Sequence, residues 1–155
     1  SEDIQKLLEE KEAELAEAKN RMIRALADYD NLRKRSESER EEIVKISNEA
    51  LMQALLPILD NFDRAIRSAE EHQIHEEVLK GFALINQQFQ DILKRAGLEE
   101  IQAQGQPFDP HFHEAIMTKE DDGEGNKILE VVQKGYTLFG KLLRPSMVIV
   151  SKGKS

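Results

Sequence analysis

The chain has 155 residues, no cysteine, and 22 Lys and Arg against 30 Asp and Glu, which gives a formal net charge of −8 at pH 7. The length predicts one domain, or one domain with an appendage, and the aromatic content of only 5% argues against a large compact core. The acidic balance argues against nucleic acid as the main partner, because phosphate contacts need clustered basic residues, and the lack of cysteine excludes disulfides, thiolate zinc sites and thiol catalysis.

The hydropathy pattern bears on the compartment of the protein. No apolar run approaches the roughly 18 residues that would suggest a membrane-spanning helix. The N-terminal segment SEDIQKLLEEKEAELAEAK has no apolar signal-peptide core, and its first residue is Ser rather than Met, which suggests that a tail was trimmed. We therefore expect no membrane association and a cytoplasmic location.

The first 56 residues contain neither glycine nor proline, so they can form a helix on the order of 80 Å long. A 4-3 spacing places one series of residues on a single face: Leu8, Lys11, Leu15, Ala18, Met22, Ala25, Tyr29, Leu32, Ser36, Glu39, Ile43, Ile46 and Ala50. Spacing of this kind is typical of the seam of a coiled coil. We predict that residues 1–50 form a long paired helix, with a single solvated helix held by charge pairs as the alternative.

The seam is imperfect in its composition. Lys11, Ser36 and Glu39 are polar, and Ala18 and Ala25 bury little apolar area. The pairing is therefore expected to be marginally stable and to melt readily. The larger seam residues expected in the dimer interface are Leu15, Met22, Tyr29 and Leu32.

Residues 51–97 predict two shorter helices with wide apolar faces. The apolar positions are Leu51, Leu55, Ile58, Phe62 and Ile66 in the first helix, and Val78, Phe82, Ile85, Phe89, Ile92 and Ala96 in the second. Pro57 either kinks the first helix or begins a new one. The segment Ala69–His75 is predicted to be a connection, and Gly97 is predicted to end the second helix.

Two helices do not enclose a core, but two chains supply four. We therefore predict a dimeric four-helix bundle, with Leu55, Phe62, Phe82 and Phe89 in its interface. Gly81 lies inside the second helix, where it is either merely tolerated or marks a close approach between helices.

Residues 98–155 predict a small all-β domain, so the fold class is α+β. The expected strands are Leu98–Ile101, Ala115–Thr118, Ile128–Leu138 and Leu142–Ser151, with a hairpin turn at Gly140. A β-domain of this size is near the lower limit for independent stability, so we expect it to lean on the helices.

A search for chemistry yields no expected catalytic, cofactor-binding or metal-ligating residue. His111 and His113 could share a metal, with Glu114 adjacent, but no further ligands follow at a plausible spacing and zinc needs three or four. The proline-flanked Asp109 suits a structured turn in which a histidine forms hydrogen bonds. One rival hypothesis remains a small hydrolase that uses His111, His113 and Glu114.

A basic cluster, Arg33-Lys34-Arg35, lies on the long helix. It is either an ordinary solvated helix face or a docking patch for an acidic protein surface.

Several separated segments resemble one protein family. They are FDPHFHEAI and GYTLFGKLLRPSMVIV, within Phe108–Val150, together with DYDNLRKR (Asp28–Arg35) and LLPILDNFDRAI (Leu55–Ile66). In kind and order they are similar to segments of the GrpE family, the nucleotide-exchange factors of DnaK-type chaperones. The resemblance covers nearly the whole chain from about Asp28.

The resemblance implies a non-enzymatic homodimeric co-chaperone of the bacterial cytosol, or of an organelle matrix, that binds no nucleotide itself. One β-domain would contact the ATPase domain of the chaperone and wedge its nucleotide cleft open. The family is also associated with heat sensing through its helices, which would suit the marginal seam. The rival interpretation within binding proteins is a dimeric coiled-coil scaffold or adaptor for an unrelated partner.

The resemblance also implies roles for individual residues. The implied partner-binding residues are Arg33, Ile46, Val132 and Lys141. Tyr136 and Arg144 are assigned to fold support, with partner contact as their alternative role.

Overall fold

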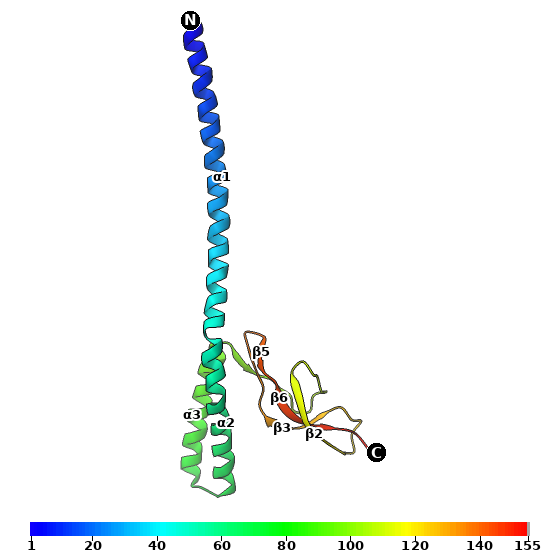
Figure 1. Ribbon diagram of the computed structural model, residues 1–155. Coiled ribbons are helices and arrows are strands. Elements are labelled where there is room, and N and C mark those ends of the chain that lie inside the picture. The colour runs from blue at the N-terminus through cyan, green and yellow to red at the C-terminus, as the bar shows by residue number, and fades with distance from the viewer. Residues whose placement is uncertain (155) are drawn as a thin grey trace. The chain divides into compact units, whose positions relative to one another are not determined.

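The computed structural model describes residues 1–154 and contains both helices and strands, which confirms the α+β class (Figure 1). The helices are α1 (Glu2–Ser47), α2 (Glu49–Glu71) and α3 (Glu76–Arg95). The strands are β1 (Leu98–Glu100), β2 (His113–Lys119), β3 (Ile128–Gln133), β4 (Tyr136–Leu138), β5 (Lys141–Arg144) and β6 (Ser146–Ser151). The chain divides into two compact units, Ser1–Ile46 and the part that begins at Ser47.

The helix α1 is long and solvated along its whole length within the chain. It has 46 residues, and none of the residues Glu2–Ser47 is buried. Its apolar side chains, among them the four predicted interface residues of the seam, are exposed. Ion pairs such as Lys11–Glu14 and Arg35–Glu39, each at 2.8 Å, join neighbouring turns. Pairing with a second chain stays a prediction.

The break between the first two helices is at Asn48 and not at Pro57. Ser and Asn compete with the helical backbone for hydrogen bonds, which favours a helix boundary at Ser47-Asn48. The Asn48 carbonyl accepts the first hydrogen bond of α2, from the Met52 amide at 2.9 Å. Pro57 lies inside α2, so the prediction that a new helix could begin there is wrong.

The helices α2 and α3 lie side by side, and residues after α3 pack against them (Figure 1). Gly97, with φ of 98°, follows α3 in the left-handed conformation that commonly ends a helix. A first apolar core joins α2, α3 and the strands β1 and β4. It consists of Met52, Leu56 and Leu59 from α2, Leu93 from α3, and Leu98, Tyr136 and Leu138 from the strands. The β-domain therefore leans on the helices, as the sequence predicted.

The strands form two three-stranded sheets, with orders β1-β4-β5 and β2-β6-β3. All pairs are antiparallel except β2 with β6, which is parallel. A second core consists of Ala103 together with Ile128 from β3 and Val148 and Val150 from β6. The predicted turn at Gly140 is confirmed, because β4 and β5 form a hairpin around Phe139 and Gly140, both at positive φ.

Two long strands of the prediction are wrong, because each is split between the two sheets. Ile128–Leu138 divides into β3 and β4 at Lys134-Gly135, where the Gly135 amide donates to the Ser146 hydroxyl at 3.1 Å. Leu142–Ser151 divides into β5 and β6 at Pro145, whose nitrogen cannot donate to a strand ladder.

Candidate functional site

The two predicted partner-binding residues of α1 are exposed. Arg33 lies beside a shallow groove that also involves Tyr29 and Leu32, and its Nη2 is 3.3 Å from Asp30 Oδ1. Ile46 is exposed near the end of α1. Both can therefore be reached by another protein.

The two predicted partner-binding residues of the β-domain lie on strands of different sheets, Val132 on β3 and Lys141 on β5. Val132 on β3 is 42% exposed. Lys141 begins β5, and its side chain is 71% exposed. The Lys141 Nζ is 3.2 Å from Glu49 Oε2 at the start of α2.

Tyr136 and Arg144 are of a different kind, because both are largely buried. Tyr136 belongs to the first core, and burial raises the pKa of its phenol above the ordinary value, with the nearby Glu100 and Asp63 carboxylates acting in the same direction. The Arg144 guanidinium lies over the Tyr136 ring, 5.5 Å from its centroid. This placement favours fold support over partner contact for both residues.

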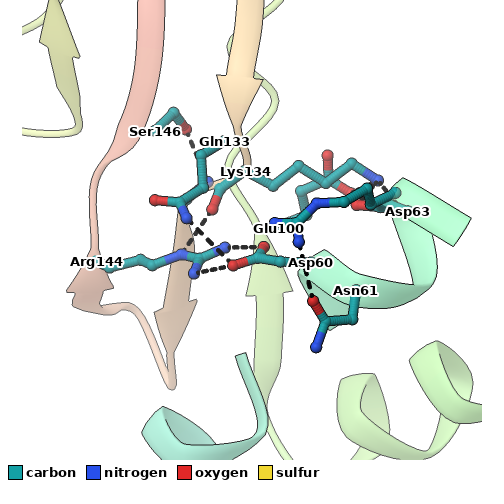
Figure 2. Close-up of polar contacts among 10 residues, drawn as sticks. Asp60, Asn61, Asp63, Glu100, Gln133, Lys134, Arg144 and Ser146 are labelled. Atoms are coloured by element: carbon teal, nitrogen blue, oxygen red, sulfur yellow. Dashed lines mark hydrogen bonds and ion pairs between the residues drawn. The ribbon is translucent and has the colours of Figure 1, made fainter. Parts of the chain in front are cut away.

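Asp60 on α2 is the centre of a polar network that reaches two strands (Figure 2). Arg144 donates to both of its carboxylate oxygens, from Nη1 to Oδ2 at 2.7 Å and from Nη2 to Oδ1 at 2.5 Å. Gln133 Nε2 donates to the same carboxylate at 3.2 Å. Arg144 Nε donates to the Lys134 carbonyl at 2.8 Å. We call Asp60, Asp63, Gln133, Lys134 and Arg144 the Asp60 network.

The remaining ion pairs of this network involve Lys134, in the link between β3 and β4. Its Nζ lies 3.2 Å from Asp63 Oδ2, one helical turn after Asp60, and 3.8 Å from Glu100 Oε2 on β1. Figure 2 shows Asp63, Glu100 and Lys134 gathered beside the Asp60–Arg144 pair. The side chains are partly buried, so solvent screens them less than a surface pair.

A groove of about 300 Å³ lies beside the Asp60 network, between α2 and β3. The lining combines Val132, Gln133, Lys134 and Met147 with the charged α2 residues Asp60, Asp63, Arg64 and Arg67. The predicted contact residue Val132 therefore lies at an open surface next to the polar contacts that join α2 to β3 and β5.

Sequence reasoning did not single out Glu49, Asp60 or Asp63. The three-residue spacing of the two aspartates, next to buried Leu56 and Leu59, places them at the edge of the apolar face of α2. That position could have indicated that the two aspartates form ion pairs, since carboxylates at the edge of a buried face need cationic partners. The sequence position does not show which basic residues those partners are.

The predicted interface residues of the bundle fall into two groups. Phe82 on α3 is exposed. Leu55 and Phe89 pack against the first core, and the Phe62 and Phe89 rings lie 6.2 Å apart. Phe62 and Phe89 therefore contact each other within one chain, and a role in an interface between chains stays a prediction.

The histidine segment forms a turn, as predicted. The His113 ring is buried, and its Nδ1 accepts a hydrogen bond from the Asp109 amide at 2.9 Å. The Asp109 carboxylate accepts from the His111 amide at 2.9 Å, and this bond is the main cause that lowers the Asp109 pKa. His113 thus stabilises the turn, and no cluster of three metal-binding side chains exists among residues 1–154.

No helix within the described part of the chain combines the length and the apolar character needed to cross a membrane.

The chain is similar to known proteins over nearly its whole length. The family model described as GrpE matches residues 1–152. Curated relatives named Protein GrpE include those of Alkaliphilus oremlandii, 41% identical over 98% of this chain and 81% of the relative, and of Halalkalibacterium halodurans, 44% identical over 84% and 68%. The Protein GrpE of Parageobacillus thermoglucosidasius is 42% identical over 92% of this chain, which spans 64% of that relative. These similarities give no support to an unrelated scaffold. The chain belongs to the GrpE family, the co-chaperone nucleotide-exchange factors of DnaK.

Proposed function

We propose that this protein accelerates ADP release from a DnaK-type chaperone by binding the ATPase domain of the chaperone in its open form. Family membership carries the proposal. The exposed positions of Val132 and Lys141 support it, because they offer an apolar contact and a cation on one small domain.

Exchange of this kind needs selective binding and no catalytic residue. A protein that binds the open ATPase domain more tightly than the closed one weakens ADP binding by the same factor, because the coupling is reciprocal. A tenfold effect needs only about 1.4 kcal/mol of differential binding. ATP, which favours the closed cleft, would then expel the exchange factor. We accordingly propose that the chain is not an enzyme and binds no nucleotide itself.

We further propose that the functional form is a homodimer in which α1 pairs with its copy and α2 and α3 form a four-helix bundle. The long exposed apolar stripe of α1 supports this, because a second amphipathic helix is the natural cover for such a stripe. The three parts 1–50, 51–97 and 98–155 would then serve as paired helix, bundle and chaperone-binding domain. The bacterial relatives favour the bacterial cytoplasm as the location.

The deciding experiment measures the release of fluorescent ADP from a DnaK-type chaperone with and without this chain. We expect a concentration-dependent acceleration, and no acceleration would reject the proposal.

The homodimer is tested separately by light scattering at micromolar concentration. Leu32→Asp at the seam should weaken pairing, whereas Ala27→Asp on the opposite face of α1 should not. A single chain with an intact helical spectrum in the unsubstituted protein would contradict the paired architecture.

A second role, heat sensing by α1, is favoured by one observation. No residue in Glu2–Ser47 is buried, so within the chain this helix lacks the tertiary packing that usually stabilises helices. A helix that depends on a weak seam would melt first and would reduce exchange activity on heating.

A further inference from the structure

We propose that Asp60 and Arg144 are positioning residues of the exchange reaction: their ion pair fixes the strands that carry Val132 and Lys141 on α2. The inference rests on the proposed function, since it assigns a role within the same site. It also decides between the two roles of Arg144 left open by the sequence.

All three guanidinium nitrogens of Arg144 are engaged within the chain, and the side chain is mostly buried. Nε, Nη1 and Nη2 each donate to an acceptor of this chain, namely the Lys134 carbonyl and the two oxygens of Asp60. The side chains of Arg144 and Asp60 are only 15% and 17% exposed. A residue so enclosed acts on a protein partner through what it holds in place.

What the pair holds in place is the exposed contact surface. Asp60 and Arg144 are 84 residues apart in sequence, and Gln133, which also donates to Asp60, is 73 residues away. Val132 precedes Gln133 on β3, and Lys141 lies on β5 with Arg144. The contacts of Asp60 therefore join α2 to both strands that carry the exposed residues.

The contact of Arg144 with both oxygens of Asp60 is suited to fixing the orientation of the strands on α2. A guanidinium that donates two parallel hydrogen bonds to a carboxylate restricts both distance and angle, which a single ammonium contact does not. In the Lys141–Glu49 pair, by contrast, one ammonium nitrogen contacts both Glu49 oxygens, at 3.4 and 3.2 Å, and the lysine side chain is 71% exposed. Such exposed pairs hold their geometry weakly.

The apolar core cannot replace this function. Leu56 and Leu59 pack against Tyr136 and Leu138 and attach the strands to α2, but hydrophobic burial is non-directional. The directional hydrogen bonds of the Asp60 network fix the orientation of the strands on α2. Lys134, whose Nζ contacts Asp63, provides a second and more exposed polar link between the same elements.

The test compares Asp60→Asn, Arg144→Gln and the double variant in the ADP-release assay, with Asp91→Asn on α3 as the matched control. We expect each single variant to raise the half-saturating concentration about tenfold, because only a fraction of molecules then present the site correctly. The release rate at saturation should stay unchanged, since Val132 and Lys141 remain intact. The double variant should be no worse than either single variant, and Asp91→Asn should match the unsubstituted protein.

The double variant separates positioning from contact. If Arg144 touched the chaperone independently of Asp60, the two single effects would multiply in the double variant, and the proposal would be overturned. It would equally be overturned if Asp60→Asn left the half-saturating concentration unchanged. Failure of the unsubstituted protein to accelerate release would instead reject the proposed function.

A distance measurement gives a readout that partner contact would not move. The chain has no cysteine, so spin labels can be attached at Glu70→Cys on α2 and Thr118→Cys on β2 alone. With labelled chain diluted in unlabelled chain, Asp60→Asn and Arg144→Gln should broaden the distance distribution, while Arg144→Lys should broaden it less. An unchanged distribution in a folded Arg144→Gln variant would contradict the positioning role.

Discussion

The helix α1 and the part of the chain that begins at Ser47 are stabilised in opposite ways. Four ion pairs of α1, Lys11–Glu14, Arg33–Asp30, Lys34–Asp30 and Arg35–Glu39, each join residues three or four positions apart. In the second unit, the contacts of Asp60 and Asp63 with Gln133, Lys134 and Arg144 join residues 71 to 84 positions apart.

The comparison shows which part depends on its surroundings. Pairs within a helix contribute about 0.2–0.5 kcal/mol each and cannot fix a long helix alone. The second unit has two apolar cores and long-range polar contacts of its own. We therefore attribute rigid presentation of the proposed contact surface to the second unit, and we expect the state of α1 to vary with temperature and concentration.

The largest expected difference between the two regions is in thermal unfolding. The helices α1, α2 and α3 have 46, 23 and 20 residues, so α1 supplies about half of the helical circular dichroism. We expect this half to be lost first on heating, in a step separate from the rest. Ala25→Leu at the seam should raise the first transition, and Ala27→Leu on the opposite face should not. One sharp transition for all helices would contradict the comparison.

Gly135→Ala should destabilise the second unit strongly. A Cβ at this position would lie 2.6 Å from the Pro145 carbonyl carbon, and backbone cannot easily move aside. Overpacking against backbone should cost about 3 kcal/mol, measured by urea unfolding of the strand signal. The transition of α1 should be unaffected. Normal stability of the β-domain in this variant would show that the close approach of Gly135 and Ser146 is not required.

Lys141→Glu should weaken chaperone binding while it leaves the fold and the proposed dimer intact. Reversal of an exposed charge in the proposed site should lower affinity about tenfold, or about 1.4 kcal/mol, and the loss should shrink at high salt. Lys154→Glu, an equal charge change at another exposed lysine, is the control. Retained affinity of Lys141→Glu at moderate salt would remove Lys141 from the site.

Gly81→Ala should give the smallest change in stability, and it tests whether a helix of a second chain approaches α3 closely. Apart from its two chain neighbours and the nearby backbone of its own helix, a Cβ there meets no atom of the described residues within 4 Å, and alanine favours a helix interior over glycine by up to about 1 kcal/mol. We therefore expect a modest gain in the unfolding temperature of α2 and α3. A loss would instead indicate that a helix of another chain approaches Gly81 closely.

The sequence predicted features that depend on local chemistry. The absence of glycine and proline predicted the long first helix, the glycine after Lys94-Arg95 predicted the end of α3, and Gly140 predicted the hairpin. Each of these depends on residues close together in the chain, whose conformational preferences can be read directly.

Features that depend on distant residues were not predictable in the same way. Nothing local shows that Gly135 must approach Ser146, so Ile128–Leu138 was predicted as one strand. Nor does the sequence show which of its 22 basic residues contacts Asp60. Partners 84 residues apart are selected by the packing of α2 against the strands, which only the folded structure reveals.

The central place of β6 in its sheet has a consequence for biosynthesis. β2 and β3 each pair with β6, so neither has its partner in this sheet until Ser146–Ser151 has been translated. The helices leave the ribosome earlier, and N-terminal parts generally fold first during synthesis. If the chain dimerises as proposed, we expect nascent chains to associate through their helices before the β-domain is complete. Limited proteolysis of stalled chains would then find protected helices and cleavable strands.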